Sequence, residues 1–220
     1  MKRWFVWWAL FSAAALGYGE TLFNFNTGWS FYKEKQSDFL YYGPQFNLGT
    51  SFYPKSSPVG FFIDYLITVR SAGDNPASLE NASESPMLLA EFGLAVGPSF
   101  ILRVNPWVMV IFSAGTFWSI SDHTVMDYGS TESTASASFS DINMGLQGDI
   151  SFLFRIGKWF FFKTGVNGIW TFFKSPVPNE SAEETASYRF ANKNRYKNML
   201  APLHTLGVAP YFGLGFGFLF

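Results

Sequence analysis

The residues that could most readily do chemistry are two histidines and the side chains around one of them. His123 directly follows Ser121 and Asp122, and His204 precedes the last apolar segment. A histidine base beside a serine and an acidic residue can support nucleophilic hydrolysis. Such a run arises easily by chance in a serine-rich segment, so we interpret both histidines as solvated loop residues. We therefore predict no catalytic residues and no enzymatic activity.

The composition also argues against metal, cofactor and nucleic-acid chemistry. The chain has no cysteine, which excludes disulfides, thiolate metal sites and a cysteine nucleophile. The remaining ligating residues do not have the spacing of a metal site. The formal net charge is −1, so there is no basic field to attract nucleic acid. We expect no metal, no cofactor and no nucleic-acid partner.

A second set of polar side chains alternates with large apolar residues along the chain. Lys163 and Asp149 fall within diagonal reach on neighbouring segments, and Arg70 and Glu91 form a second candidate pair nearer the long loops. Charges in a narrow interior are costly unless they are paired. The set fits either a structural network that closes the interior or a polar gate that rearranges. Its members are Asp64, Arg70, Glu91, Gln147, Asp149, Lys163 and Asn167.

These polar residues lie in segments where large apolar and small or polar residues alternate with a period of two. In residues 21–32, for example, Phe23 and Phe25 oppose Asn24 and Asn26. A strand places successive side chains on opposite faces, so each such segment predicts a strand with one apolar face. We predict eight strands, at 21–32, 39–53, 60–70, 88–102, 108–121, 141–156, 160–174 and 205–220.

The connections between the predicted strands alternate between long and short. Polar loops follow every odd strand, and tight turns follow every even one. With 20% aromatic and only 14% charged residues, this predicts an all-β, eight-stranded, antiparallel up-and-down transmembrane barrel. A soluble sandwich or lipocalin-like barrel would need a solvated set of lysines and glutamates on its outer face. The predicted loops are 33–38, 71–86, 122–140 and 175–200, and the turns are 54–59, 104–107 and 157–159.

The first residues read as a cleavable signal peptide. Two basic residues precede an apolar run over 4–16, and small residues follow it. That run is shorter than the ~20 residues that a spanning helix needs, which argues against a membrane anchor. We expect residues 1–19 to form the signal, with cleavage after Gly17 or Gly19, and residues 20–220 to form the barrel. An even strand number places both mature termini on the short-turn, periplasmic side and the long loops outside the cell.

The C-terminal strand carries a family resemblance. The chain resembles the small eight-stranded barrels of the bacterial outer membrane, whose last strand ends on an aromatic residue that the barrel-assembly machinery reads. Gly215, Phe218 and Phe220 match that signal, although Gly213 stands where a polar residue is usual. Length and loop sizes are most similar to OmpW, more than to OmpX or the OmpA barrel. The resemblance implies an outer-membrane location, contact with outer-membrane lipid and a hydrophobic mouth.

The interior near the long loops is predicted to be apolar. Such a lining either stiffens the top of the barrel by packing or forms a pocket for a small hydrophobic solute. Strand eight points mostly glycines inward, which leaves space for bulky neighbours or for a passage. We expect a narrow pore or pocket; the alternative is a non-conducting barrel that contacts host surface molecules through its loops. The predicted mouth residues are Tyr32, Phe39, Tyr41, Leu66, Leu89, Phe117, Ile169 and Phe173.

Overall fold

Eight long strands make up the fold. A computed structural model describes residues 19–34, 40–55, 57–72, 87–126, 136–177 and 205–219. The strands are β1 (Gly19–Glu34), β2 (Leu40–Pro54), β3 (Val59–Ala72), β4 (Met87–Asn105), β5 (Val108–Met126), β6 (Ser136–Arg155), β7 (Phe160–Val177) and β8 (Thr205–Leu219). All eight predicted strands are present. The predicted signal peptide lies outside the described residues except for Gly19, where β1 begins.

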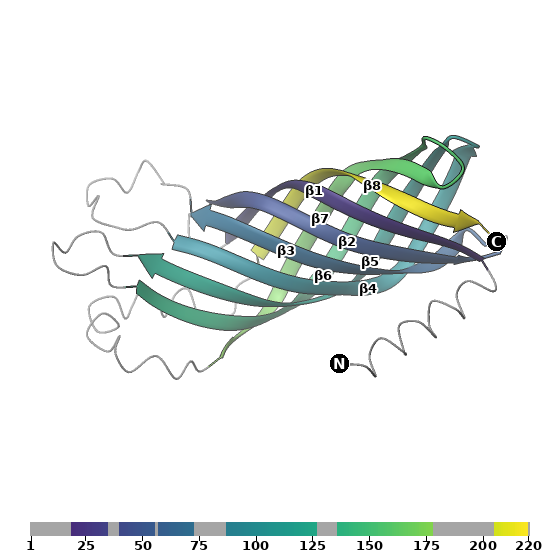
Figure 1. Cartoon of the computed structure of the whole chain (residues 1–220). Helices are drawn as coiled ribbons and strands as arrows, with labels where there is room; N and C mark the ends of the chain where they lie inside the picture. The colour runs from purple at the N-terminus through teal and green to yellow at the C-terminus, as the bar shows by residue number, and fades with distance from the viewer. Residues whose placement is uncertain are drawn as a thin grey trace, which may run out of the picture.

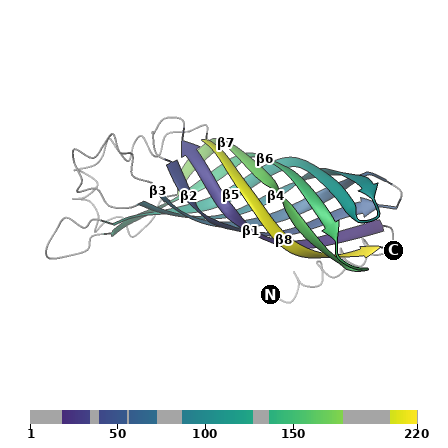
Figure 2. The same ribbon diagram turned by 90° about the horizontal axis from the view of Figure 1, so that it is seen from above.

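Each strand pairs antiparallel with its neighbours in sequence, and β1 also pairs with β8, so the sheet closes into a barrel (Figures 1 and 2). The seam runs from Glu20 opposite Leu219 to Glu34 opposite Thr205. Closure pairs the backbone groups that an open sheet would leave exposed at its edges. The predicted fold class is confirmed. We call the two ends of the barrel the turn end, where 54–59, 105–108 and 155–160 connect strands, and the loop end opposite.

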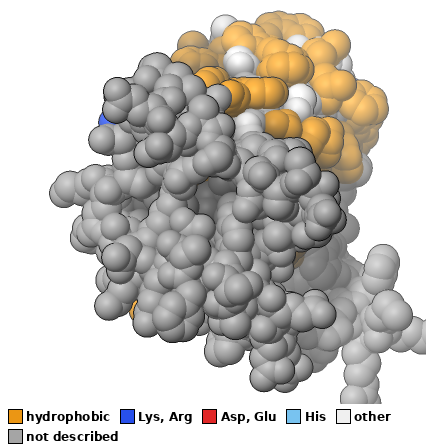
Figure 3. All heavy atoms as spheres, turned by 90° about the vertical axis from the view of Figure 1, so that its left-hand side faces the viewer, with side chains coloured by type: hydrophobic (Ala, Val, Ile, Leu, Met, Phe, Trp, Pro, Cys, Tyr) orange, Lys and Arg blue, Asp and Glu red, His pale blue; other side chains and the backbone are white. Residues whose placement is uncertain are grey.

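The outer wall is apolar. Outward side chains such as Phe25, Phe92 and Leu214 are half exposed, and the part of the wall visible from the loop end is covered by hydrophobic side chains (Figure 3). Trp107 and Trp159 lie outward at the turn end. Within the described ranges, no helix is long and apolar enough to cross a membrane. An apolar outer band with aromatic residues at its borders is typical of a barrel surrounded by lipid.

Strands β5 and β6 extend further than the sequence predicts. Residues 122–126 and 136–140 lie in the predicted third loop, yet they continue the β5–β6 ladder, with Met126 opposite Ser136. The two strands project beyond their neighbours at the loop end (Figure 1). The apolar alternation stops before these residues, which is expected where both faces of a ribbon leave the lipid. The prediction of a loop there was wrong because it relied on that alternation.

A bulge in β7 changes which side chain enters the barrel. Met144 pairs with Phe173 whereas Gly145 pairs with Thr171, so β7 carries an extra residue at this point. A bulge shifts every later side chain to the other face. Phe173 is therefore 44% exposed on the outer wall, and the prediction that it points inward was wrong. Lys174 points inward instead and is buried.

The barrel interior is filled by alternating apolar and polar layers. Along β7 the inward residues run from Phe161 through Lys163 and Asn167 to Ile169 and then Lys174. The lower apolar layer, toward the turn end, consists of Leu22, Tyr53, Ile101, Met109, Ile111, Leu153 and Phe161. The upper apolar layer consists of Phe62, Leu66, Ala95, Phe117 and Ile169.

The inward glycines of β8 make room for bulky side chains. A Cβ atom at Gly215 would lie 2.3 Å from Cζ of Phe161, and one at Gly217 would lie 2.7 Å from Cδ2 of Leu22. Both partners belong to the lower apolar layer. These glycines therefore leave no passage at that level, because side chains from other strands occupy the space.

Candidate functional site: the layered barrel interior

The upper polar layer, on the loop side of the upper apolar layer, is built around Arg70 and Glu91. Nη1 of Arg70 lies 2.7 Å from Oε2 of Glu91, and both side chains are buried. Nε of Arg70 donates to Oγ of Ser30 at 2.9 Å, a bond that reaches past β2 from β3 to β1. Ser119 donates to Oε1 of Glu91 at 2.6 Å. The structure thus brings the predicted pair together and satisfies the carboxylate from several sides, as a buried charge requires.

A second ion pair in this layer was missed by the sequence analysis. Nζ of Lys174 lies 2.9 Å from Oδ2 of Asp141, with both side chains buried. Beside it, Asn143 donates to Ser121 at 2.8 Å and to Ser119 at 3.3 Å. The β7 bulge brings Lys174 inward, and that bulge has no clear signal in the sequence.

The middle polar layer lies between the two apolar layers and holds the other predicted polar residues. Nζ of Lys163 lies 3.7 Å from Oδ1 of Asp149, which brings together the predicted pair. Tyr211, which the sequence analysis did not single out, donates its hydroxyl to Oδ2 of Asp149 at 2.5 Å. Gln147 donates to Oδ2 of Asp64 at 3.3 Å, a bond that crosses the lumen from β6 to β3.

Asn167 completes the predicted set without joining a pair. Its side chain is only 1% exposed, yet its amide nitrogen and oxygen have no hydrogen-bond partner among the described residues. All seven predicted interior residues are therefore buried in the lumen, five in the middle polar layer and two in the upper one.

The predicted mouth residues occupy several levels of the lumen. Leu66, Phe117 and Ile169 pack against one another in the upper apolar layer, and Phe117 has no exposed surface. Tyr41 and Leu89 are also buried but do not belong to that layer. The centre of the Tyr32 ring lies 4.9 Å from Cζ of Arg70, beneath the guanidinium. Phe39 lies outside the described residues. Leu66, Phe117 and Ile169, which were predicted to line a mouth, therefore pack inside the lumen with the upper polar layer above them, whereas Tyr32 and Leu89 lie at the level of that layer.

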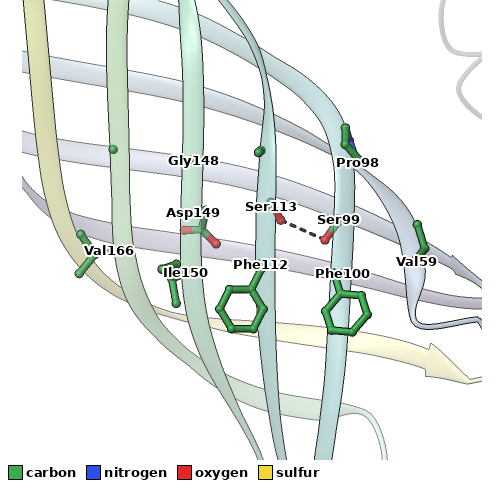
Figure 4. A pocket seen from close by; sticks show the side chains of 12 residues that line it. Val59, Pro98, Ser99, Phe100, Phe112, Ser113, Gly148, Asp149, Ile150 and Val166 are labelled. Atoms are coloured by element: carbon green, nitrogen blue, oxygen red, sulfur yellow. Dashed lines mark hydrogen bonds between the residues drawn. The ribbon is translucent and has the colours of Figure 1, made fainter.

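A groove of about 550 Å³ lies on the other side of the wall, facing outward (Figure 4). Phe100, Phe112, Ile150 and Val166 form one border. Small residues form its floor, and a Cβ atom at Gly148 would have no neighbour closer than 4.0 Å. A side chain added on the floor of this groove would therefore meet open space, whereas one added at an inward glycine such as Gly215 would meet a packed side chain.

Gly93→Ala is expected to reduce the free energy of unfolding by about 1–3 kcal/mol, because overpacking forces buried groups to shift. Its new Cβ would lie 2.5 Å from Cε2 of Phe117, a ring held in the upper apolar layer. Gly148→Ala is the matched control, because its Cβ enters the open groove. Urea unfolding of the refolded protein measures both variants, and equal midpoints would contradict the packing of Phe117 against Gly93.

The candidate triad does not assemble on one face. Ser121 is buried and accepts a hydrogen bond from Asn143, whereas Asp122 is exposed on the opposite face and accepts one from Ser140 at 2.5 Å. The side chains of His123 and His204 lie outside the described residues. In the part of the chain that the structure describes, no three histidine, aspartate or glutamate side chains gather where they could hold a metal ion.

The predicted assembly signal is described only in part. Gly215 packs against Phe161, and the backbone of Phe218 pairs with Thr21 at the seam. The side chain of Phe218 and all of Phe220 lie outside the described residues. Recognition of this strand by an assembly machinery stays a prediction.

Comparison with known proteins finds similarity in fold. No protein-family model matches the chain, and no curated protein matches it significantly. The structure is similar to a major outer membrane protein from Thermus thermophilus (TM-score 0.57, 12% identity, covering 90% of this chain and 99% of that one). It is also similar to Neisserial surface protein A (0.53, 9%, 89% and 96%) and to the attachment invasion locus protein Ail of Yersinia pestis (0.51, 16%, 91% and 99%). The chain therefore has the fold of small outer-membrane barrels.

Proposed function

We propose that the protein is a closed outer-membrane barrel that acts at the cell surface through its loop end. The observation that carries this proposal is the packing of the lumen at two levels. Phe117 lies against Gly93 in one apolar layer, and Phe161 lies against Gly215 in the other. An eight-stranded barrel is just wide enough for side chains to fill it. A filled lumen favours the non-conducting alternative over the narrow pore.

The loop end supports an interaction role. The β5–β6 ribbon projects there beyond the other strands, and the segments 73–86, 127–135 and 178–204 connect strands at this end. Projecting strands give a rigid base to connecting segments, where binding residues are commonly found. We place the loop end outside the cell and the turn end in the periplasm, with host surface molecules as the partner class.

The second candidate function is passage of small hydrophobic solutes, which the resemblance to OmpW implies. The contacts inside the lumen favour it less than the surface role. It would require Phe117 and the ion pair of Arg70 with Glu91 to move aside. Solute uptake by cells that produce the protein distinguishes the two functions. We expect uptake equal to that of cells without the protein.

Replacing residues 178–200 with a short glycine–serine linker is expected to abolish attachment of producing cells to host cells while leaving the barrel folded. The physical reason is that the segment lies outside the strands that build the wall. Cell attachment measures the effect, and heat-dependent gel mobility shows whether the barrel still forms. A matched variant shortens the 54–59 turn at the opposite end by one residue. Unchanged attachment of the 178–200 variant would contradict this prediction. Unchanged attachment after each of the three long loops has been replaced would contradict the surface role itself.

A further inference from the structure

The middle polar layer contains one more carboxylate than it has cations. Asp149 has two close partners, the ammonium of Lys163 and the hydroxyl of Tyr211. Asp64 has one hydrogen bond from the described residues, donated by Gln147 at 3.3 Å. The nearest cation further up β3 is Arg70, which is paired with Glu91. Among the described residues, Lys163 is therefore the single cation that serves two buried carboxylates in this layer.

The same layer has buried acceptor oxygens that find no donor in the part of the chain that the structure describes. Gln147 uses its amide nitrogen on Asp64, which turns its Oε1 away, and this oxygen has no partner. Asn26 donates to Oδ1 of Asn24 at 2.6 Å and is left with a free Oδ1 of its own. Oδ1 of Asn167 is also without a partner, and all three side chains are at least 98% buried. Buried acceptors of this kind call for a donor or a cation.

The side chains of Asp64 and Asn24 meet beside Gly49. These two side chains fill the space on the lumen side of Gly49, where the position of a Cβ lies 2.3 Å from Oδ1 of Asp64 and 2.8 Å from both Oδ1 and Nδ2 of Asn24. The lumen-crossing bond of Gln147 ends at the same carboxylate. The carboxylate of Asp64 on β3 therefore meets the amides of Asn24 on β1 and Gln147 on β6. The next inward residues of β3 on either side of Asp64 are the apolar Phe62 and Leu66.

We propose that this point binds one alkali cation, sodium or potassium, with Asp64 as its charged ligand. Carboxylate, carbonyl and water oxygens are the ligands that hard cations prefer. The surplus of a single charge selects a monovalent ion, because a divalent ion would leave the layer positive. Asn24 supplies its amide oxygen. The amide of Gln147 turns over, so that its free Oε1 faces the ion in place of the nitrogen that donates to Asp64. Water molecules complete the coordination.

The test compares thermal unfolding of the refolded full-length protein in sodium, potassium and N-methylglucamine chloride at equal ionic strength and pH. A ligand that binds only the folded state raises the unfolding midpoint. We expect sodium or potassium to raise the midpoint by about 2–4 °C over N-methylglucamine. Asp64→Asn should remove this dependence. Glu91→Gln, which alters a carboxylate in the other polar layer, should lower the midpoint and keep the dependence.

A second variant keeps the proposal falsifiable if Asp64→Asn does not fold. Gln147→Lys places an ammonium beside Asp64, so it should fold without dependence on the cation. The sodium-23 NMR line of a sodium chloride solution should broaden when the wild-type barrel is added and stay unchanged when Gln147→Lys is added. Equal unfolding midpoints of the wild type in all three salts would overturn the proposal. Water or a proton, in place of a cation, would then satisfy Asp64. A dependence on the cation that persists in Asp64→Asn or Gln147→Lys would also overturn it.

Discussion

Arg70→Met is expected to lower the free energy of unfolding by about 3–5 kcal/mol, the cost of leaving one partner of a buried ion pair alone. Glu91 would lose its contact at 2.7 Å with the guanidinium, and the bond from Arg70 on β3 to Ser30 on β1 would disappear as well. Urea unfolding followed by tryptophan fluorescence measures the loss. The effect is large because both side chains are buried in the upper polar layer.

Two further variants separate this effect from a general loss of charge. Lys158→Ala removes an exposed cation whose Nζ lies 5.1 Å from the centre of the Trp159 ring, and it should cost less than about 1 kcal/mol. The double variant Arg70→Met with Glu91→Leu should lose less than the sum of the single changes, since no charge is then left unpaired. If Arg70→Met costs no more than Lys158→Ala, the ion pair does not stabilise the barrel.

Phe117→Ala is expected to cost about 3–5 kcal/mol, because it deletes a large buried ring and leaves a cavity. The ring has no exposed surface and belongs to the upper apolar layer. Phe112→Ala is the matched control on the same strand. Phe112 is exposed on the outer wall, where detergent or lipid chains fill the space that the ring leaves, so its loss should be clearly smaller.

The cavity that Phe117→Ala leaves should also bind a small apolar ligand. An apolar cavity of this kind binds small apolar molecules such as benzene. Benzene should therefore raise the urea midpoint of Phe117→Ala and leave that of the wild type unchanged. Equal effects of benzene on both proteins, or equal costs of Phe117→Ala and Phe112→Ala, would contradict a packed upper apolar layer.

The strands and their inward faces could be predicted from the sequence because lipid and lumen impose a strict period of two. The pairs Lys163–Asp149 and Arg70–Glu91 could also be predicted, since each joins neighbouring strands of a meander. The limits of this approach appear where the period is interrupted. The bulge near Phe173 exchanges the faces of β7, and the β5–β6 ribbon continues after its apolar alternation has ended.

Contacts that reach past a neighbouring strand could not be predicted. The bonds from Gln147 to Asp64 and from Arg70 to Ser30 join strands that are not neighbours. Which residues meet there depends on how far the strands are staggered when the barrel closes. This stagger accumulates over all eight strand pairings, including that of β1 with β8, which are far apart in the sequence. The sequence also left open whether the glycines of β8 border a passage. The register of β7 against β8 places Phe161 directly opposite Gly215, and its ring closes that space.

Single-channel recording of the refolded wild-type protein in a planar lipid bilayer tests the central claim most directly. A barrel whose lumen is packed at both apolar layers should leave the bilayer current at its baseline over the full voltage range. Insertion should be verified in the same membranes by heat-dependent gel mobility. Reproducible stepwise openings of the wild type would contradict the account and restore the narrow pore as the function.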